Sequence, residues 1–179
     1  MHVRPAEEGD ARSVAQVHVR SWQEASRGQV PESYLAGLSV DQREPIWQGI
    51  LAQTAWPATG TLLLVKDEEV IGFAHISPTR DHHSRPNVGE ITAIYLAPQH
   101  WGQGGGQLLI EGALSALREA GFDEATLWVL DTNERAQRFY RAGGWVADGA
   151  AKVDESRGFP LRELRYRRPL QPGLDACLC

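Results

Sequence analysis

The segment best suited to chemistry is a glycine-rich turn at residues 101–107, which reads Trp-Gly-Gln-Gly-Gly-Gly-Gln. It follows an apolar run typical of a strand and precedes a run with helical period. Four glycines in five positions leave the backbone amides uncovered, and the first amides of a helix have no partners within it. Such amides and the helix dipole bind phosphate oxygens. The turn therefore predicts a phosphate site, and a pyrophosphate in particular.

Two common nucleotide-binding motifs do not fit this turn. A P-loop ends in Gly-Lys-Ser/Thr, whereas Gln107 and Leu108 follow Gly106 here. A dinucleotide fingerprint has the spacing G-x-G-x-x-G in a first βαβ unit, with an acidic residue further on, and this turn lies past the middle of the chain. The remaining alternative is structural, namely that the glycines only make a tight turn.

Two polar residues follow at helical spacing. Asn133 and Tyr140 are seven positions apart, which is two helical turns, so both side chains project from one face. Spacing alone leaves two roles open for Tyr140, which are packing between helix and sheet or contact with a ligand.

The elements that must position these residues follow from periodicity and turn signals. Helices are expected at residues 10–25, 31–35, 41–53, 104–120 and 133–142, and strands at 3–5, 61–66, 70–77, 88–97, 125–130, 145–147 and 161–168. Pro45 is unfavourable inside the third helix, so its start is expected nearer to Glu44. The order predicts an α/β fold of mixed α+β type. It has one central, mixed, mostly antiparallel sheet of six to seven strands, with helices on both faces.

The run from Ile94 to Gly106 resembles the pyrophosphate loop of the GNAT superfamily of N-acetyltransferases. The signature of that loop is Gln/Arg-x-x-Gly-x-Gly/Ala after an apolar triplet and a proline. Trp101 stands where the signature has Gln or Arg. The resemblance extends from Val3 to about Leu170, and the N-terminal part is similar to an uncharacterised bacterial branch. It implies that acetyl-CoA, with no metal, lies in a V between strands 91–96 and 125–130. The implied cofactor-binding residues are Ile94, Tyr95, Leu96, Trp101, Gly102, Gln103, Gly104, Gly105, Gly106, Gln107 and Asn133.

The resemblance also implies the reaction, which is attack of a neutral amine on the acetyl thioester in a ternary complex. The segment 131–145 is similar to the second motif of the superfamily and favours Tyr140 as the acid that protonates the leaving thiolate. Glu90 lies eleven residues before Trp101, the offset of a glutamate in the histone-acetylating branch, so Glu90 is the predicted base, acting through a water. A solvated strand-end carboxylate is the alternative interpretation of Glu90, and His75 is the alternative base.

The acceptor, a primary amine of a small molecule or peptide, is expected to bind between the first two helices and the loops opposite the cofactor. Trp22, Glu24 and Tyr34 supply aromatic walls and a carboxylate that suit an amine, and His75 completes the predicted substrate-binding set. Antibiotics, polyamines, amino acids and protein N-termini or lysines all stay open as acceptors. His82 and His83 lack a spaced third ligand, which argues against a metal site.

Composition limits the remaining choices. The chain has 179 residues, a net charge of −5 and 42% hydrophobic residues, the balance of an ordinary soluble domain. The acidic charge argues against a nucleic-acid partner and favours a cationic one. No run of 18 apolar residues exists, so no membrane span is predicted.

The C-terminal end carries the two cysteines, Cys177 and Cys179, which predict reduced thiols in a cytoplasmic protein. A single domain is expected over residues 1–170, and residues 171–179 are expected to form a disordered tail. A homodimer stays open. Two rival functions also stay open, which are a non-catalytic acyl-CoA-binding or regulatory module and a nucleotide-binding protein.

Overall fold

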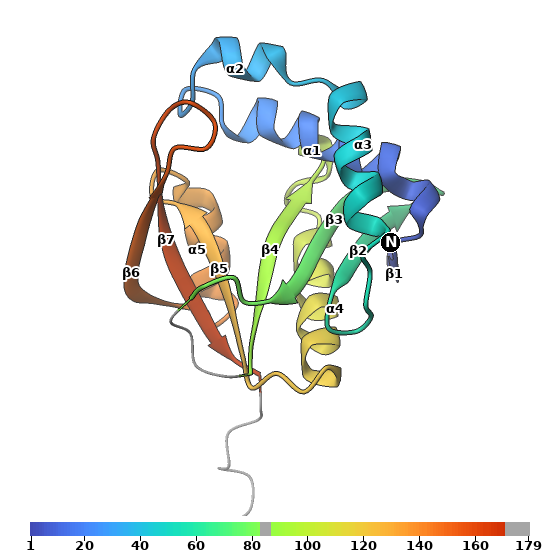
Figure 1. Ribbon diagram of the computed structural model, residues 1–179, viewed down its shortest axis with the longest axis vertical. Helices are drawn as coiled ribbons and strands as arrows, with labels where there is room; N and C mark the ends of the chain where they lie inside the picture. Colours follow the sequence, from blue (N-terminus) through green and yellow to red (C-terminus); the bar gives the residue numbers. More distant parts are fainter. Residues whose placement is uncertain (83–86, 171–179) are drawn as a thin grey trace, which may run out of the picture.

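A computed structural model describes residues 1–82 and 87–170, and Figure 1 shows its sheet with helices above and behind. The strands are β1 (His2–Pro5), β2 (Gly60–Lys66), β3 (Glu69–Pro78), β4 (Val88–Leu96), β5 (Glu124–Leu130), β6 (Val146–Asp154) and β7 (Leu161–Pro169). The helices are α1 (Ala11–Ala25), α2 (Glu32–Gly37), α3 (Val40–Leu51), α4 (Gly105–Glu119) and α5 (Glu134–Ala142), with short 3-10 turns η1 (Glu8–Asp10) and η2 (Pro98–His100).

The seven strands form one sheet in the order β1-β2-β3-β4-β5-β7-β6. Every neighbouring pair is antiparallel except β4 and β5, which run parallel. The predicted mixed, mostly antiparallel sheet of six to seven strands is therefore confirmed, with seven strands.

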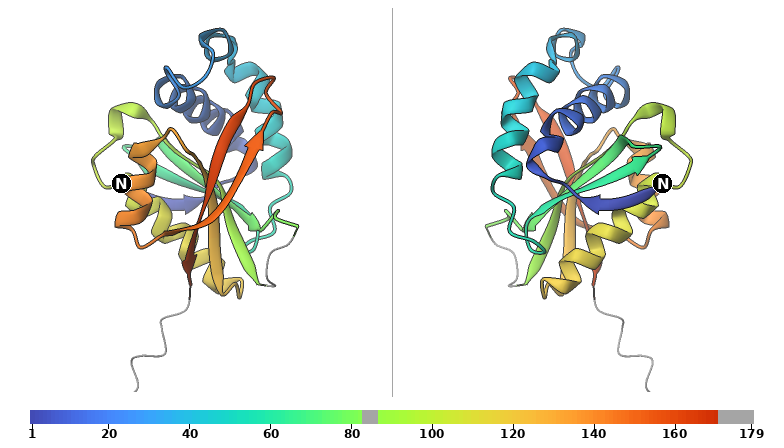
Figure 2. Two further views of the ribbon diagram at one scale, coloured as in Figure 1. Left: turned by 90° about the vertical axis from the view of Figure 1, so that its left-hand side faces the viewer. Right: turned by 90° about the vertical axis from the view of Figure 1, so that its right-hand side faces the viewer.

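Two helical layers cover the two faces of this sheet, as Figure 2 shows. α4 and α5 pack on one face through a core that includes Leu64, Leu109 and Leu127. α1 and α3 pack on the other face through a second core that includes Leu63 and Trp47. Neighbouring residues of β2 therefore enter different cores, and this strand is a continuous apolar run because both of its faces are buried.

The parallel strands β4 and β5 pair only over three residues. Val88–Glu90 face Glu124–Thr126, and beyond this point the two strands diverge into a V, which Figure 1 shows opening toward α1. The amide of Ala97 donates to the carbonyl of Ile71 at 2.8 Å, which sets the alternation of the antiparallel β3–β4 ladder. By that alternation, the backbone groups of Ile94 and Leu96 point away from β3 and into the V.

The turn between β6 and β7 reaches α2 at the top of the molecule (Figure 1). The rings of Tyr34 and Phe159 meet edge to face, with centroids 5.0 Å apart. Leu161 packs in a third core with Trp22 and Leu35. The hairpin is thus fixed to the layer that contains α1 and α2.

Two predicted elements differ from the structure. The third helix does not start near Glu44 but at Val40, and Pro45 lies inside it. Pro45 is exposed, so water can satisfy the carbonyl that the proline leaves without a donor, while Trp47 and Leu51 anchor the helix. The strand expected at 145–147 corresponds to β6, which is much longer. β6 is an exposed edge strand without apolar alternation, so its sequence did not indicate its length. Among the described residues, no helix is both long and apolar enough to cross a bilayer.

Candidate active site

One continuous cleft of about 680 Å³ runs through the V between β4 and β5. Its glycine-loop half lies on the α4–α5 side and contains Trp101, Gly102, Gly104, Gly106, Gln107, Asn133, Arg135, Phe139 and Tyr140. Its charged half lies toward α1 and contains Trp22, Arg80, Glu90, Tyr95, Trp128, Lys152, Asp154, Arg157 and Glu163. The volume is in the usual range for a small-molecule site.

The glycine loop leaves a row of backbone amides free at the start of α4. Gly102 and Gly104 have φ angles of +73° and +84°, which other residues rarely adopt. Gly104 is the N-cap residue of α4 and supplies no side-chain cap, so the amides of the first turn have no partner within the helix. A Cβ on Gly105 would lie 2.6 Å from the Leu64 side chain. The glycines therefore make a tight turn and allow close packing, and the same turn exposes the amides.

Trp101 fastens the loop to the end of β4. Its indole Nε1 donates to the carbonyl of Leu96 at 2.8 Å, and the hydroxyl of Ser21 on α1 donates to the same oxygen at 3.1 Å. The Leu96 carbonyl thus already accepts two hydrogen bonds. The backbone groups of Ile94 and the amide of Leu96 are the groups that face the V for a ligand.

Arg135 is a residue of the glycine-loop half that sequence reasoning missed. Its guanidinium carbon lies 3.3 Å from the centroid of the Trp101 ring. Burial lowers the pKa of Arg135, and no carboxylate among the described residues pairs with it. Its position in the sequence could have indicated a binding role. A cation in the first turn of a helix is unfavourable next to the helix dipole, so a bound anion is one explanation for it.

Tyr140 and Asn133 both line the glycine-loop half. Burial, and then the neighbouring Tyr95, raise the pKa of Tyr140, so its phenol is protonated at neutral pH and can donate a proton. Within the described residues, its hydroxyl makes no hydrogen bond. Asn133 caps α5 by accepting from the amide of Ala136 at 3.1 Å, which leaves its side-chain NH₂ available to the cleft.

Glu90 lies in the charged half and is only 1% exposed. Both of its carboxylate oxygens accept hydrogen bonds from Arg80. The backbone amide reaches Oε2 at 2.9 Å, and the guanidinium Nη2 and Nε reach Oε1 at 2.6 and 3.3 Å. Glu90 is therefore a buried carboxylate paired with Arg80, and not a solvated carboxylate at the end of a strand. A water at Glu90 has to use the lone pairs that Arg80 leaves free.

The structure brings most of the predicted site residues to the cleft, but not all. Those that line it are Trp22, Glu90, Ile94, Tyr95, Leu96, Trp101, Gly102, Gly104, Gly106, Gln107, Asn133 and Tyr140. Those outside its lining are Glu24, Tyr34, His75, Gln103 and Gly105. The roles predicted for all of these residues stay predictions.

Three predicted acceptor residues have other partners. Glu24 makes an exposed ion pair with Arg27 at 3.0 Å. Tyr34 packs against Phe159, as described above. His75 shares a 2.8 Å hydrogen bond with the hydroxyl of Thr61, and burial, with a smaller contribution from Arg80, lowers the pKa of His75 to about 4.

Within residues 1–82 and 87–170, no group of three His, Cys, Asp or Glu side chains is placed to hold a metal ion. His83, the two cysteines and the predicted tail at 171–179 lie outside the described residues.

Comparison with known proteins adds independent information. A family model described as Acetyltransferase (GNAT) family matches residues 15–144. The uncharacterized N-acetyltransferase YuaI of Bacillus subtilis (strain 168) is 31% identical over 133 residues, which cover 73% of this chain and 72% of that protein. A mycothiol acetyltransferase of Acidimicrobium ferrooxidans is 36% identical over 91 residues, which cover 50% of this chain and 28% of that one.

Solved structures share the fold at lower identity. The PaiA N-acetyltransferase of Thermoplasma acidophilum, in complex with coenzyme A, has a TM-score of 0.67 at 18% identity over 94% of this chain and 98% of that one. A ribosomal-protein-alanine N-acetyltransferase of Brucella melitensis has a TM-score of 0.71 at 18% identity, over 94% of this chain and 99% of that one.

Proposed function

The chain belongs to the GNAT family of acetyltransferases, and from this premise we propose that it transfers an acetyl group from acetyl-CoA to a primary amine of a small molecule or peptide. Transfer is by direct attack in a ternary complex. The observation that carries this proposal is the continuity of the cleft, which joins an anion-binding half to a charged half through the V beside Tyr140. A donor and an acceptor that enter from opposite faces meet at this point.

The glycine-loop half fits the donor. The free amides at the start of α4 and the unpaired Arg135 suit the pyrophosphate of acetyl-CoA. The backbone groups of Ile94 and the side-chain NH₂ of Asn133 suit the amide groups of its pantetheine arm. The PaiA relative binds coenzyme A, which supports the same use of this half.

The acceptor amine must lose a proton before it attacks, because its pKa is near 10 in water. Glu90 is the base in this proposal and acts through a water that takes the proton from the amine nitrogen. Arg80 holds the carboxylate in one orientation from two sides. The amine lone pair then forms the N–C bond at the thioester carbonyl, and the nitrogen loses its surplus proton to water in the cleft as the C–S bond breaks and the amide forms.

Tyr140 acts on the other product. When the C–S bond breaks, the electron pair stays on sulfur, and the Tyr140 hydroxyl donates a hydrogen bond and then its proton to the thiolate. Burial, which raises the pKa of Tyr140, also raises the pKa of a thiol released beside it, so the thiolate becomes a better proton acceptor. The tyrosine recovers its proton from solvent after the product leaves.

The alternative is an acyl-CoA-binding or regulatory module without turnover. Such a module has no need for a hydroxyl and a carboxylate on either side of the V, and Tyr140 and Glu90 both line the cleft. We therefore favour the enzyme, acting in the cytoplasm.

The test is Tyr140→Phe, assayed by thiol release from acetyl-CoA with a panel of primary amines. General acid catalysis contributes roughly a hundredfold or more, so kcat is expected to fall by about that factor while the affinity for CoA stays unchanged. Unchanged turnover in Tyr140→Phe removes the acid role.

Two further measurements separate the proposal from its rivals. Thermal shifts with acetyl-CoA, CoA, ATP and NAD identify the ligand, and stabilisation by ATP alone excludes the donor. Glu90→Gln retains the shape of the side chain, and a loss of kcat that is largest at low pH supports the base role. A folded protein that binds CoA but acetylates no amine in the panel is the module.

A further inference from the structure

The charged half contains as many acidic as basic side chains, but they are not equally accessible. Its three carboxylates each pair with a cation. Glu90 pairs with Arg80 at 2.6 Å, Glu163 with Lys152 at 3.6 Å, and Asp154 with Arg157. In each pair the cation is the more exposed partner, most clearly for Arg80, whose side chain is 62% exposed against 1% for Glu90. An incoming ligand therefore meets cations first.

The aromatic walls of the charged half are also already occupied. The Lys152 ammonium lies 4.1 Å from the centroid of the Trp128 ring. The Arg157 guanidinium lies 5.0 Å from the centroid of the Trp22 ring. The faces that would attract a cationic ligand by cation–π contact thus hold the protein's own cations.

Arg157 is held in this position by the β6–β7 hairpin. The hairpin packs on α2 through the contact of Phe159 with Tyr34, and on α1 through Leu161 and Trp22. Burial raises the pKa of the Tyr95 hydroxyl, and the charge of Arg157 is among the smaller effects that oppose this rise, so this charge acts inside the cleft. Asp154 is bound by one guanidinium nitrogen, and a guanidinium has five N–H groups, so donors remain for a ligand.

We propose that the acceptor is an amine that also carries a carboxylate, and that Arg157 and Lys152 bind this carboxylate while the amine faces the V. The inference rests on the proposed acetyl transfer and narrows its acceptor class. A polyamine finds no unpaired carboxylate among the described residues of the cleft and meets three cations. An amino acid brings its carboxylate to the outward cations Arg157 and Lys152 and presents only one amine, which faces the V.

The experiment compares amines in matched sets, namely α-amino acids, their primary carboxamides, and α,ω-diamines of similar length. The wild type is expected to turn over amino acids with the highest kcat/KM and diamines with the lowest. The amide and the acid differ in the basicity of their amines, so the decisive quantity is the acid-to-amide ratio of kcat/KM, compared between wild type and variant.

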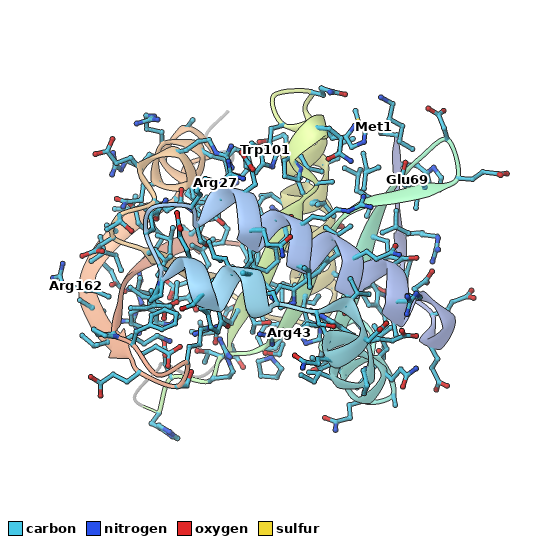
Figure 3. The ribbon with its side chains drawn as sticks, turned by 90° about the horizontal axis from the view of Figure 1, so that it is seen from above. Met1, Arg27, Arg43, Glu69, Trp101 and Arg162 are labelled. Carbon is cyan, nitrogen blue, oxygen red and sulfur yellow. The ribbon has the colours of Figure 1, made fainter. Side chains whose placement is uncertain are left out.

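Arg157→Gln is expected to lower this ratio by about tenfold, since hydrogen bonds to charged groups contribute roughly that much to affinity. Lys152→Gln is expected to lower it less, because the ammonium is more exposed. Arg157→Lys retains the charge and is expected to restore part of the ratio. The matched control is Arg162→Gln, which removes an exposed arginine of β7 that pairs with Asp131 outside the cleft. Figure 3 shows Arg162 at the outer edge of the molecule, away from Trp101.

Preference for diamines or amides, or an acid-to-amide ratio that Arg157→Gln leaves unchanged, overturns this inference while acetyl transfer stands. A protein that stays folded and acetylates neither these sets nor the wider panel of primary amines, peptides included, fails the proposed function itself. Stabilisation by CoA in each variant shows that the fold and the glycine-loop half are intact.

Discussion

The two halves of the cleft are built in different ways. The glycine-loop half comes from one short contiguous turn, the first turn of α4 and one face of α5, and backbone amides at the start of α4 are its main groups for an anion. The charged half is assembled from side chains of α1, β4, β5, β6, β7 and two connecting segments. A site made of backbone groups needs particular residues, here glycines, at neighbouring positions, so it is visible in the sequence as a motif. A side-chain site can be rebuilt from several distant positions without leaving a motif, and this is the half in which we propose that the acceptor binds.

The first way to test this contrast is to cover the backbone amides. Gly106→Val places a branched side chain over the loop, where an added Cβ would lie 3.2 Å from the Phe139 ring. We expect the affinity for CoA to fall by about a hundredfold, since each lost hydrogen bond to a charged group is worth roughly 1.5–3 kcal/mol. Isothermal titration with CoA measures the change.

The matched control for this variant is Gly49→Val. Gly49 lies in α3, and a Cβ there meets no atom within 4 Å. Equal losses in both variants would mean that helix stability, rather than access to the amides, decides the affinity.

The second test concerns the effect of low pH on the packing of α1 and α3 behind the charged half. His18 stacks on Tyr95, and its Nδ1 accepts from the indole of Trp47 at 3.1 Å, so this nitrogen is unprotonated. Burial, with the charges of Arg43 and Arg157, lowers the pKa of His18 to about 4. The unfolded chain binds a proton near pH 6.5, so stability is full above this pH and falls as the pH drops toward 4.

His18→Gln retains an acceptor and removes the titration. Compared with wild type, its loss of unfolding free energy between pH 7 and pH 4.5 is expected to be smaller by about 2 kcal/mol. Urea unfolding at the two pH values gives this difference. The pKa of His75 is lowered in the same direction, so part of the dependence of stability on pH remains in the variant. An identical slope in wild type and variant would contradict the prediction.

The smallest expected effect returns to the glycine-loop half and its one cation. Arg135→Gln is expected to weaken CoA binding by about tenfold, equivalent to about 1.4 kcal/mol. The matched control is Arg138→Gln, one turn further along α5, where the side chain is exposed and pairs with Glu134. If both variants lose the same affinity, the effect is long-range charge and not contact with phosphate.

The sequence predicted the fold, and placed the glycine turn between β4 and α4, for a physical reason. Periodicity reports burial, and β4, α4 and β5 are buried on one or both faces. The long β6 was missed because an exposed edge strand has no such pattern. The start of α3 was predicted too late in the chain, because Pro45 cannot donate the backbone hydrogen bond of a helix interior. In this exposed helix, water can satisfy the carbonyl that lacks this donor.

The charged half was less accessible to prediction. Trp22 and Glu90 were assigned to the site, but Arg157, Lys152 and Glu163 come from a hairpin whose contact with α2 depends on tertiary packing. Glu24 and Tyr34 were chosen for their types, and neither type indicates which side of α1 or α2 faces the cleft. The acidic net charge of the chain likewise did not predict the outward cations of this half.

The divergence of β4 and β5 also matters for aggregation. Beyond Glu90, each strand has an unpaired side within the molecule, and unpaired strand edges recruit strands of other chains. Here the two edges face each other across a cleft closed above by α1, and the Leu96 carbonyl is already capped by Ser21 and Trp101. On the proposed function, the pantetheine arm adds at this inner edge as a short strand, in a place that α1 and the capped Leu96 carbonyl make hard for a strand of another chain to reach.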